Sequence, residues 1–265
     1  MQKIEMYCVT NKEFLYLNKL PYNLAAVGQL NFSKNYIRCD NEDNIYNKEK
    51  NYSELTFHYW FWKNSFPKSN SEWIGFCQKR RFWIKPESMQ KDINLENLNE
   101  HILTTIPENI KKYESIICKP ISVIGAKKIK ILKRGWKNII KNPLILLNEK
   151  KRTILLHFDM HHGYGNLTKA INLLDINDKE DFRNYVQTKN AFNPNIMFIS
   201  KPEILNKWFE VLFPWLKRCE GEFGFDNLNG YDQTRLYAYL AERYLSFWFK
   251  KYTNYIEYPW VTIDN

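Results

Sequence analysis

The chain has 265 residues and a mass of 32.1 kDa, long enough to bury a substantial core as one domain or as one domain with an appendage. Hydrophobic residues make up 44% of the sequence and aromatic residues 16%, a composition that excludes a chain disordered throughout. Lys and Arg outnumber Asp and Glu by 39 to 29, and the net charge of +10 favours anionic partners: phosphorylated small molecules, lipid headgroups or nucleic acid. Because A/T-rich codons encode the frequent Lys, Asn and Ile, genome composition is an alternative source of part of this charge.

The cysteines and the N-terminal residues bear on the cellular compartment. The five cysteines are odd in number, widely scattered and without a Cys-x-x-Cys pair, which is typical of reduced thiols in the cytosol. The N-terminal residues lack the apolar core of a signal peptide, and no stretch approaches the roughly 18 apolar residues of a membrane span. We therefore expect a cytoplasmic protein whose membrane contact is peripheral.

The first half of the chain alternates apolar segments with polar ends, a pattern typical of α/β folds. The run Ile4–Val9 predicts a strand that ends at a polar turn formed by Thr10, Asn11 and Lys12. Ligands of α/β proteins bind at the carboxyl ends of such strands. After a polar, Asn-rich loop, the spacing of aromatic residues predicts a helix over residues 53–63.

A second buried strand is expected over Glu72–Cys77, and a third over Ser115–Cys118. The second strand runs into Gln78, Lys79 and a pair of arginines, Arg80 and Arg81. Arginines at the end of a strand suit the recognition of phosphate or carboxylate, because the planar guanidinium donates two parallel hydrogen bonds.

The second half of the chain is predicted to be largely helical. Residues 127–151 are densely basic with interleaved apolar side chains, which favours a membrane-facing or acid-binding surface. Ser200, Pro202 and Glu203 form the pattern of an N-cap serine with a capping box, so a helix should run from about residue 202 to residue 218. Another amphipathic helix is expected over Tyr231–Tyr252. Without internal repeats or a low-complexity linker, residues 1–265 are predicted to form a single domain with a basic insertion at 127–151.

Five co-linear segments span nearly the whole chain: KIEMYCVTNK at residues 3–12, DNIYNKEKNYSELTFHYWFWKN at 43–64, EWIGFCQKRRFW at 72–83, NIMFISKPEILNKWFEVLFPWL at 195–216 and RLYAYLAERYLSFWF at 235–249. Together they resemble the capsular polysaccharide synthesis glycosyltransferases, a family long catalogued as a domain of unknown function. The resemblance implies an α/β, GT-A-like, Rossmann-related fold with a mostly parallel central sheet and C-terminal helices. It also implies transfer of a hexose, galactofuranose among the candidates, with inversion. The donor would be a nucleotide sugar, with a UDP-sugar favoured, and the acceptor a capsular or lipopolysaccharide glycan presented at the inner face of the inner membrane.

A glycosyltransferase must stabilise the departing diphosphate with positive charge or a metal, and must deprotonate the incoming hydroxyl. The resemblance assigns the diphosphate to the paired arginines, while a surface pair that bonds neighbouring acids is the alternative. Glu54 is a catalytic candidate because the family's matching segment carries Glu-Leu-Thr; in the first turn of a helix it also fits a structural role. The expected donor-binding residues are Thr10, Asn11, Lys12, Asp40, Asp43, Asn44, Arg80 and Arg81.

Three of the five histidines surround one aspartate in the segment 157–165. His162 matches a histidine that the family tends to carry, so it is a second catalytic candidate, with Asp159 a third. Asp159 and His161 are candidate ligands of Mn or Mg, because carboxylate and imidazole both bind Mn. A helix end with exposed histidines before a Gly-rich turn is the alternative.

The expected acceptor-binding residues are Gln78, Asn195, Met197, Glu242 and Arg243, although Met197 also fits a place in the core. Neighbouring residues of a helix point in different directions, so Glu242 and Arg243 are expected to find separate partners. Gln78 and Lys79 stand where the family usually has a His-Tyr pair, which indicates a donor or acceptor preference unlike the family's commonest.

Two other functions fit parts of the sequence. A nucleic-acid-binding protein would explain the charge and the aromatic residues, but we find no zinc-finger spacing, ribonucleoprotein motif or helix-turn-helix, so no nucleic acid partner is expected. A non-catalytic partner in capsule assembly would explain the missing His-Tyr pair.

Overall fold

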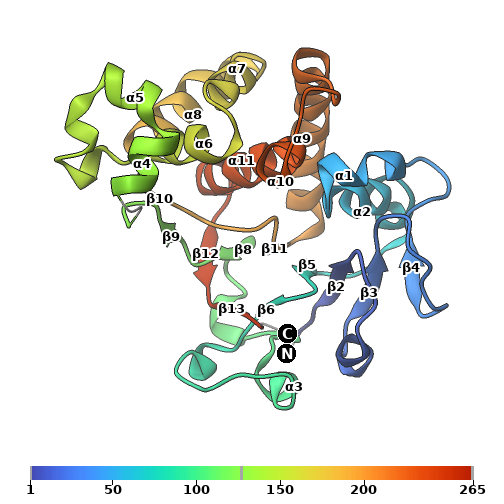
Figure 1. Cartoon of the computed structure of the whole chain (residues 1–265). Helices are drawn as coiled ribbons and strands as arrows, with labels where there is room; N and C mark the ends of the chain where they lie inside the picture. Colours follow the sequence, from blue (N-terminus) through green and yellow to red (C-terminus); the bar gives the residue numbers. More distant parts are fainter. Residues whose placement is uncertain (1, 126–127, 264–265) are drawn as a thin grey trace. The chain divides into compact units, whose positions relative to one another are not determined.

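The computed structural model describes residues 2–125 and 128–263, and the chain divides into two compact units (Figure 1). Lys127, the first residue of the predicted basic insertion, lies outside the described residues. Each unit is discontinuous in sequence. Unit 1 comprises Met1–Lys119, Asn195–Val211 and Trp248–Asn265, and unit 2 comprises Pro120–Pro194 and Leu212–Phe247.

Unit 1 is built on a mixed, mostly parallel sheet with the strand order β12-β8-β11-β5-β2-β3-β4. The neighbours β5, β2, β3 and β4 are parallel, whereas β11 runs antiparallel between β5 and β8, and β12 is parallel to β8. The mixed α/β class with a mostly parallel central sheet and C-terminal helices is therefore confirmed. The strands are β2 (Glu5–Thr10), β3 (Asn23–Ala26), β4 (Tyr36–Arg38), β5 (Ile74–Gln78), β8 (Ser115–Cys118), β11 (Phe198–Ser200) and β12 (Tyr255–Tyr258), with β6 (Arg81–Trp83) between β5 and β13 (Trp260–Thr262), and β1 (Gln2–Lys3) paired with β7 (Thr105–Ile106).

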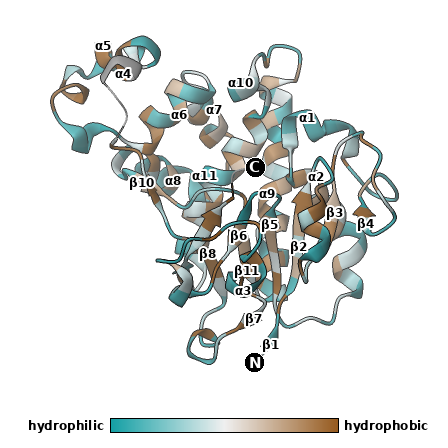
Figure 2. Ribbon diagram, turned by 60° about the horizontal axis from the view of Figure 1, so that its bottom comes forward, coloured by the Kyte–Doolittle hydropathy of each residue, from teal (hydrophilic) through white to brown (hydrophobic). Residues whose placement is uncertain are grey.

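The central strands are buried on both faces, as parallel strands generally are, and they carry many hydrophobic residues (Figure 2). On one face Met6 lies opposite Gly75, where a Cβ atom would come within 2.9 Å of the Met6 side chain. On the other face Tyr7 and Phe76 pack against aromatic residues, among them Phe61, whose ring centre lies 4.8 Å from that of Tyr7. Aromatic packing and one close glycine contact thus hold β2 against β5.

The sequence predicted these main elements well, with three local corrections: the start of the helix predicted over residues 53–63, the N-cap of the helix predicted from residue 202 and the division of the helix predicted over residues 231–252. The helix predicted over residues 53–63 begins at Leu55 as α2 (Leu55–Trp60) and continues into the π-helical turn Phe61–Ser65. Ser53, with φ +54°, lies before it and separates it from α1 (Glu49–Tyr52). The helix expected from residue 202 is α9 (Pro202–Phe223).

Ser200 is not the N-cap that the sequence predicted. It is the last residue of β11, paired with Ser115 and Ile74, and its buried Oγ has no hydrogen-bond partner among the described residues. The sheet register holds Ser200 away from the helix start, and Lys201 instead accepts the first turn's amide hydrogen bonds through its carbonyl.

Unit 2 is mainly helical, and α9 and α11 each contribute residues to both units. The predicted helix over 231–252 is divided at Arg235 into α10 and α11. None of the helices within residues 2–125 and 128–263 is long and apolar enough to cross a membrane. The helices of this part are α4 (Lys128–Arg134), α5 (Trp136–Lys141), α6 (Ile154–His162), α7 (Asn166–Asn172), α8 (Ile176–Thr188), α10 (Tyr231–Thr234) and α11 (Leu236–Tyr252), with a small ladder between β9 (Ile121–Ser122) and β10 (Ala191–Phe192).

His58 of α2 lies in the aromatic layer of unit 1 and is 1% exposed. Its ring centre lies 4.2 Å from that of Phe76, and its Nδ1 has no hydrogen-bond partner among the described residues. Burial lowers the pKa of His58 from its usual 6.5 to about 3. The residue therefore stays neutral in the folded protein at pH values where the unfolded chain binds a proton.

Replacing this residue, His58→Leu, should raise the free energy of unfolding by about 1 kcal/mol at neutral pH, because an unsatisfied buried polar atom is removed. Below about pH 6.5 the unfolded wild type gains a proton that the folded form refuses, which lowers wild-type stability by up to about 1.4 kcal/mol per pH unit. The advantage of the variant should therefore grow on acidification toward pH about 5. Urea unfolding at both pH values measures it.

His101→Leu is the matched control. His101 is only half-buried, and its Nδ1 is hydrogen-bonded to the Ser88 hydroxyl at 3.0 Å. Loss of that hydrogen bond should destabilise the protein. An advantage of His58→Leu that stays constant with pH would contradict the neutral, buried state of His58.

Candidate functional site

The carboxyl ends of β2 and β5 bring together several predicted donor-binding residues. Since Val9 and Gln78 are partners in the parallel ladder, the residues that follow them meet at one edge of the sheet. Lys79 donates from its backbone N–H to the Val9 carbonyl at 3.1 Å, and its Nζ donates to Oδ1 of Asn11. We call this group, Thr10, Asn11, Lys12 and 78–81, the sheet-edge cluster. It is a polar, basic surface where α/β proteins bind ligands.

The two arginines of the sheet-edge cluster differ in their availability. Nη1 of Arg81 donates to Oε1 of Gln78 at 2.6 Å. This hydrogen bond engages one edge of the Arg81 guanidinium and the carbonyl oxygen of the Gln78 side chain. Arg80 is exposed in the turn between β5 and β6, and its guanidinium has no hydrogen-bond or ion-pair partner among the described residues. Arg80 is therefore better placed than Arg81 to bind an anion from solution.

A second polar group lies at the carboxyl ends of β3 and β4, around Arg38. The guanidinium of Arg38 bonds Asp40 at 3.0 Å, the Tyr46 hydroxyl at 2.9 Å and the Gly28 carbonyl at 3.3 Å. The carboxyl group of Glu49, at the start of α1, also packs against Gly28. Sequence reasoning missed Arg38, whose only signal was an arginine at the end of a short apolar run.

The other predicted residues of this region mostly hold the loop that follows β4. Asp43 accepts from the Tyr59 hydroxyl at 3.1 Å, and the Asn44 side chain closes a turn on the carbonyls of residues 41 and 42. Glu54 precedes α2 and is half-buried, and its carboxylate has no partner among the described residues. Thr56, two residues later, lies beside the Cys39 thiol at the end of β4. The helix that Glu54 precedes therefore contacts the chain just after β4.

Two predicted acceptor residues of unit 1 lie on the segment that leads into β11. Met197 is fully buried in the hydrophobic core, so its contribution is to packing rather than to ligand contact. Asn195 is 7% exposed and has φ +66°, a left-handed conformation that asparagine adopts more readily than most residues. The structure thus gives Asn195 a role in shaping the chain's path.

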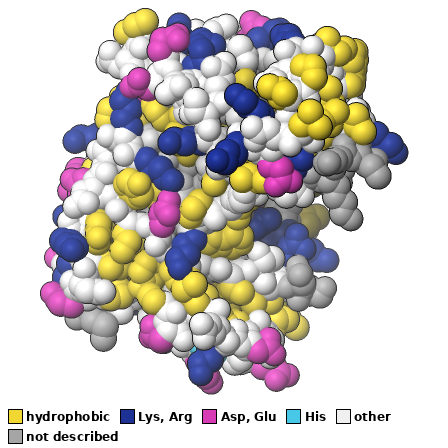
Figure 3. Space-filling model, turned by 90° about the vertical axis from the view of Figure 1, so that its left-hand side faces the viewer, with side chains coloured by type: hydrophobic (Ala, Val, Ile, Leu, Met, Phe, Trp, Pro, Cys, Tyr) yellow, Lys and Arg dark blue, Asp and Glu magenta, His cyan; other side chains and the backbone are white. Residues whose placement is uncertain are grey.

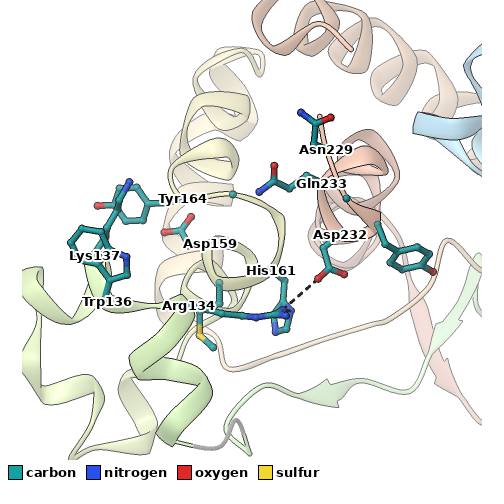
Figure 4. Close-up of a pocket in the computed structure, with 13 residues that line it drawn as sticks. Arg134, Trp136, Lys137, Asp159, His161, Tyr164, Asn229, Asp232 and Gln233 are labelled. Carbon is teal, nitrogen blue, oxygen red and sulfur yellow. Dashed lines mark hydrogen bonds and ion pairs between the residues drawn. The ribbon is translucent and has the colours of Figure 1, made fainter. Parts of the chain in front are cut away.

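In unit 2 the histidine segment forms the end of α6 beside a pocket of about 450 Å³ (Figure 4). Gly163, with φ +100°, ends the helix, and Gly165 has φ +82°. The loop before and within α10 supplies the facing wall. We call this space the α6 pocket; its lining residues are Arg134, Trp136, Lys137, Asp159, Met160, His161, Gly163, Tyr164, Asn229, Gly230, Tyr231, Asp232 and Gln233.

The predicted metal ligands of the α6 pocket are engaged with other groups. Oδ1 of Asp159 accepts from the Gly165 N–H at 3.0 Å, and burial raises the pKa of this carboxyl above its usual range. Arg134 donates to Nδ1 of His161 at 3.2 Å. This guanidinium stands at one of the two ring nitrogens of His161 that could ligate a cation, and the described residues contain no cluster of three His, Cys, Asp or Glu suited to a metal. A divalent cation held by Asp159 and His161 therefore stays a prediction.

His162 is tied into the helices of unit 2. Its Nδ1 donates to the Asp232 carbonyl at 2.8 Å, and its ring stacks on Tyr239 with centres 3.8 Å apart. Burial lowers the pKa of His162 to about 2. A histidine with so low a pKa is a weak base, and its contacts link α6 to α10 and α11.

Glu242 and Arg243 form an ion pair, so the expectation that they would seek separate partners is wrong. The guanidinium of Arg243 is buried with its centre 3.8 Å from the Phe192 ring centre. Burial lowers the pKa of Arg243, and the adjacent carboxylate opposes that shift. A buried cation needs a counter-charge, and the long flexible side chains bend toward each other to provide it.

The comparisons with known proteins place this fold in a family. The chain belongs to the family described as Domain of unknown function (DUF4422), which matches residues 5–254. No curated protein matches it. The apo structure of WbbM, a bifunctional glycosyltransferase, is similar with a TM-score of 0.67 and 18% identity, covering 100% of this chain and 46% of that chain. The chain thus spans less than half of the solved chain, with which it shares its fold.

The buried ion pair predicts that removing the charge of Glu242 strongly lowers the stability of the protein. Glu242→Gln leaves the buried Arg243 without its counter-charge and should lower the free energy of unfolding by about 3 kcal/mol. The double variant Glu242→Gln/Arg243→Met should be less destabilised than the single one, since the uncompensated charge is gone. Chemical denaturation measures all variants.

Glu180→Gln is the control, because it breaks the exposed pair with Arg183 and should cost less than about 1 kcal/mol. Equal losses for Glu242→Gln and Glu180→Gln would contradict the structural role of the buried pair.

Proposed function

We propose that the chain is a glycosyltransferase that moves a hexose from a nucleoside diphosphate donor to a glycan acceptor. The observation that carries the proposal is the fold shared with a bifunctional glycosyltransferase over 100% of this chain. The sheet-edge cluster supports it independently, because its basic, exposed side chains lie where α/β folds bind nucleotides. A GT-A-like arrangement and a UDP-sugar donor, UDP-galactofuranose among those to test, follow from the family resemblance.

In this proposal Arg80, after β5, binds the diphosphate together with Lys12, which follows β2. Charge-assisted hydrogen bonds from a guanidinium to phosphate oxygens strengthen as negative charge develops on the leaving group. Arg81 acts indirectly, because it is held by Gln78. Gln78 stands where the family usually has histidine, so the Gln78–Arg81 bond is a source of altered donor or acceptor preference.

The base in this proposal is Glu54. Its half-buried carboxylate has no partner among the described residues, whereas burial lowers the pKa of His162 to about 2. Glu54 takes the proton of an acceptor hydroxyl, whose oxygen attacks the anomeric carbon. The bond from that carbon to the diphosphate oxygen breaks, and the nucleoside diphosphate leaves with its electron pair. Direct displacement of this kind inverts the anomeric centre.

We also propose that the segment 131–147 contacts an anionic membrane that presents a lipid-linked capsular or lipopolysaccharide acceptor. Its large apolar side chains Leu132, Trp136, Ile140, Leu144 and Leu147 are all exposed and recur every three or four residues. Exposed lysines follow several of them directly, and Figure 3, which faces the side with α4 and α5, shows apolar and basic side chains together. Apolar insertion combined with lysine charge is how proteins bind anionic lipid surfaces.

The donor prediction is tested by thermal stabilisation with a panel of nucleotides and nucleotide sugars, since ligands of the folded state raise the melting temperature. UDP or a UDP-sugar should stabilise the wild type. Arg80→Ala should weaken that binding at least about tenfold, because a charged hydrogen bond is lost.

Lys68→Ala is the control, since Lys68 is exposed and precedes β5 instead of following it. Silence across the whole panel would contradict the proposed enzyme and favour a non-catalytic assembly partner. Equal affinities of Arg80→Ala and wild type would remove Arg80 from the donor site.

The membrane contact is tested by sedimentation with vesicles that contain anionic lipid. Leu147→Glu should reduce the bound fraction several-fold, because a charge replaces a side chain that is 81% exposed for insertion. Ile176→Glu, at an equally exposed leucine-sized position of α8 (78%), should bind as wild type does. Binding independent of anionic lipid, or equal loss in both variants, would refute the proposed surface.

A further inference from the structure

The α6 pocket exposes an unusual amount of aromatic surface. Trp136 is 54% exposed and Tyr231 68%, and Tyr164 stands beside Trp136 (Figure 4). Nζ of Lys137 lies 5.6 Å from the Trp136 ring centre and 5.2 Å from that of Tyr164, and Nζ of Lys141 lies 5.4 Å from the Tyr164 ring centre. Large rings around a concave space are typical of ligand sites, because covering them with a ligand removes apolar area from water.

Several polar side chains of the α6 pocket can form further hydrogen bonds with a ligand. The side-chain amides of Asn229 and Gln233 are exposed and have no hydrogen-bond partner among the described residues. The Asp159 carboxylate accepts from the Gly165 N–H through Oδ1, and a carboxylate can accept further hydrogen bonds from hydroxyl groups. Amide and carboxylate groups next to aromatic rings match a ligand with many hydroxyls and apolar C–H faces.

The charges of the α6 pocket decide between an uncharged and an anionic ligand. Arg134 and Lys137 contribute two positive charges, Lys141 on the Tyr164 ring contributes a third, and Asp159 and Asp232 contribute two acidic groups. Arg134 pairs with Asp232 at 3.4 Å and also bonds His161. A phosphate would be repelled by these two carboxylates, one of which already pairs with Arg134, whereas an uncharged ligand can accept and donate hydrogen bonds among both kinds of charge. The pocket is therefore unlike the basic sheet-edge cluster.

We infer that the α6 pocket binds an uncharged saccharide unit of the acceptor glycan. The inference rests on the proposed function and names the ligand class of a separate part of the chain. A sugar ring packs its C–H face on Tyr164, and its hydroxyls donate to Asp159 and exchange hydrogen bonds with Asn229 and Gln233. The pocket volume of about 450 Å³ lies in the range of small-molecule sites.

The test is saturation-transfer NMR of the full chain with methyl glycosides of galactopyranose, galactofuranose, glucose, mannose and N-acetylglucosamine. At least one glycoside should bind, and Tyr164→Ala should weaken it at least about tenfold, through loss of the ring and of hydrogen-bond alignment. Gln233→Ala, at an exposed position where truncation removes no buried packing, should weaken it several-fold. Tyr252→Ala, an exposed tyrosine of α11 in unit 1, is the matched control and should bind as wild type.

Stabilisation by UDP, measured on the same samples, separates this inference from the proposed function. UDP binding without any glycoside binding would overturn the saccharide site alone. Glycoside binding that both pocket variants lose, without any nucleotide binding, would support the site and count against the transferase. Equal glycoside affinities in Tyr164→Ala, Gln233→Ala and Tyr252→Ala would place binding elsewhere and overturn the inference.

Discussion

Parallel pairing of β2 with both β3 and β5 is the constraint on which unit 1 depends. It buries β2 on both faces, so residues 6–9 are apolar and are covered by core on one side and by aromatic residues on the other. It also aligns the carboxyl ends of three strands. Polar side chains that are far apart in sequence, such as Asn11 and Lys79, are thereby brought into hydrogen-bond contact. The candidate donor site is a consequence of strand direction.

The two units expose different kinds of side chain to a ligand. Unit 1 presents exposed cations at the sheet edge, with Arg80 available to an anion, while unit 2 presents a pocket that carries both signs of charge and aromatic rings at its rim. The histidines, which look most like catalytic residues in the sequence, are held by backbone and side-chain partners and have pKa values lowered by burial where a shift is resolved. Availability to a ligand, more than residue type, separates functional candidates from structural ones in this fold.

The sequence was most informative where burial and periodicity act over several residues. It predicted β2, β5, β8, α9 and the long C-terminal helix, because each carries a continuous apolar pattern. It missed β3 and β4, which are short and have little pattern of their own, and with them Arg38. The capping pattern predicted Ser200 as an N-cap, but strand pairing holds it in β11. Helix geometry predicted separate partners for Glu242 and Arg243, but the buried guanidinium needs the adjacent carboxylate as its counter-charge. The α6 pocket depends on the loop before α10, whose position no local pattern specifies.

The central claim is that a nucleoside diphosphate binds at the sheet-edge cluster. Hydrogen–deuterium exchange of the full chain with and without saturating UDP tests it most directly, because bound ligand slows the exchange of the amides that it covers. The account predicts slower exchange in the turns after β2 and β5, residues 10–12 and 78–81, with the α6 pocket unchanged. Protection confined to unit 2, or none in either turn when UDP binds, would contradict it.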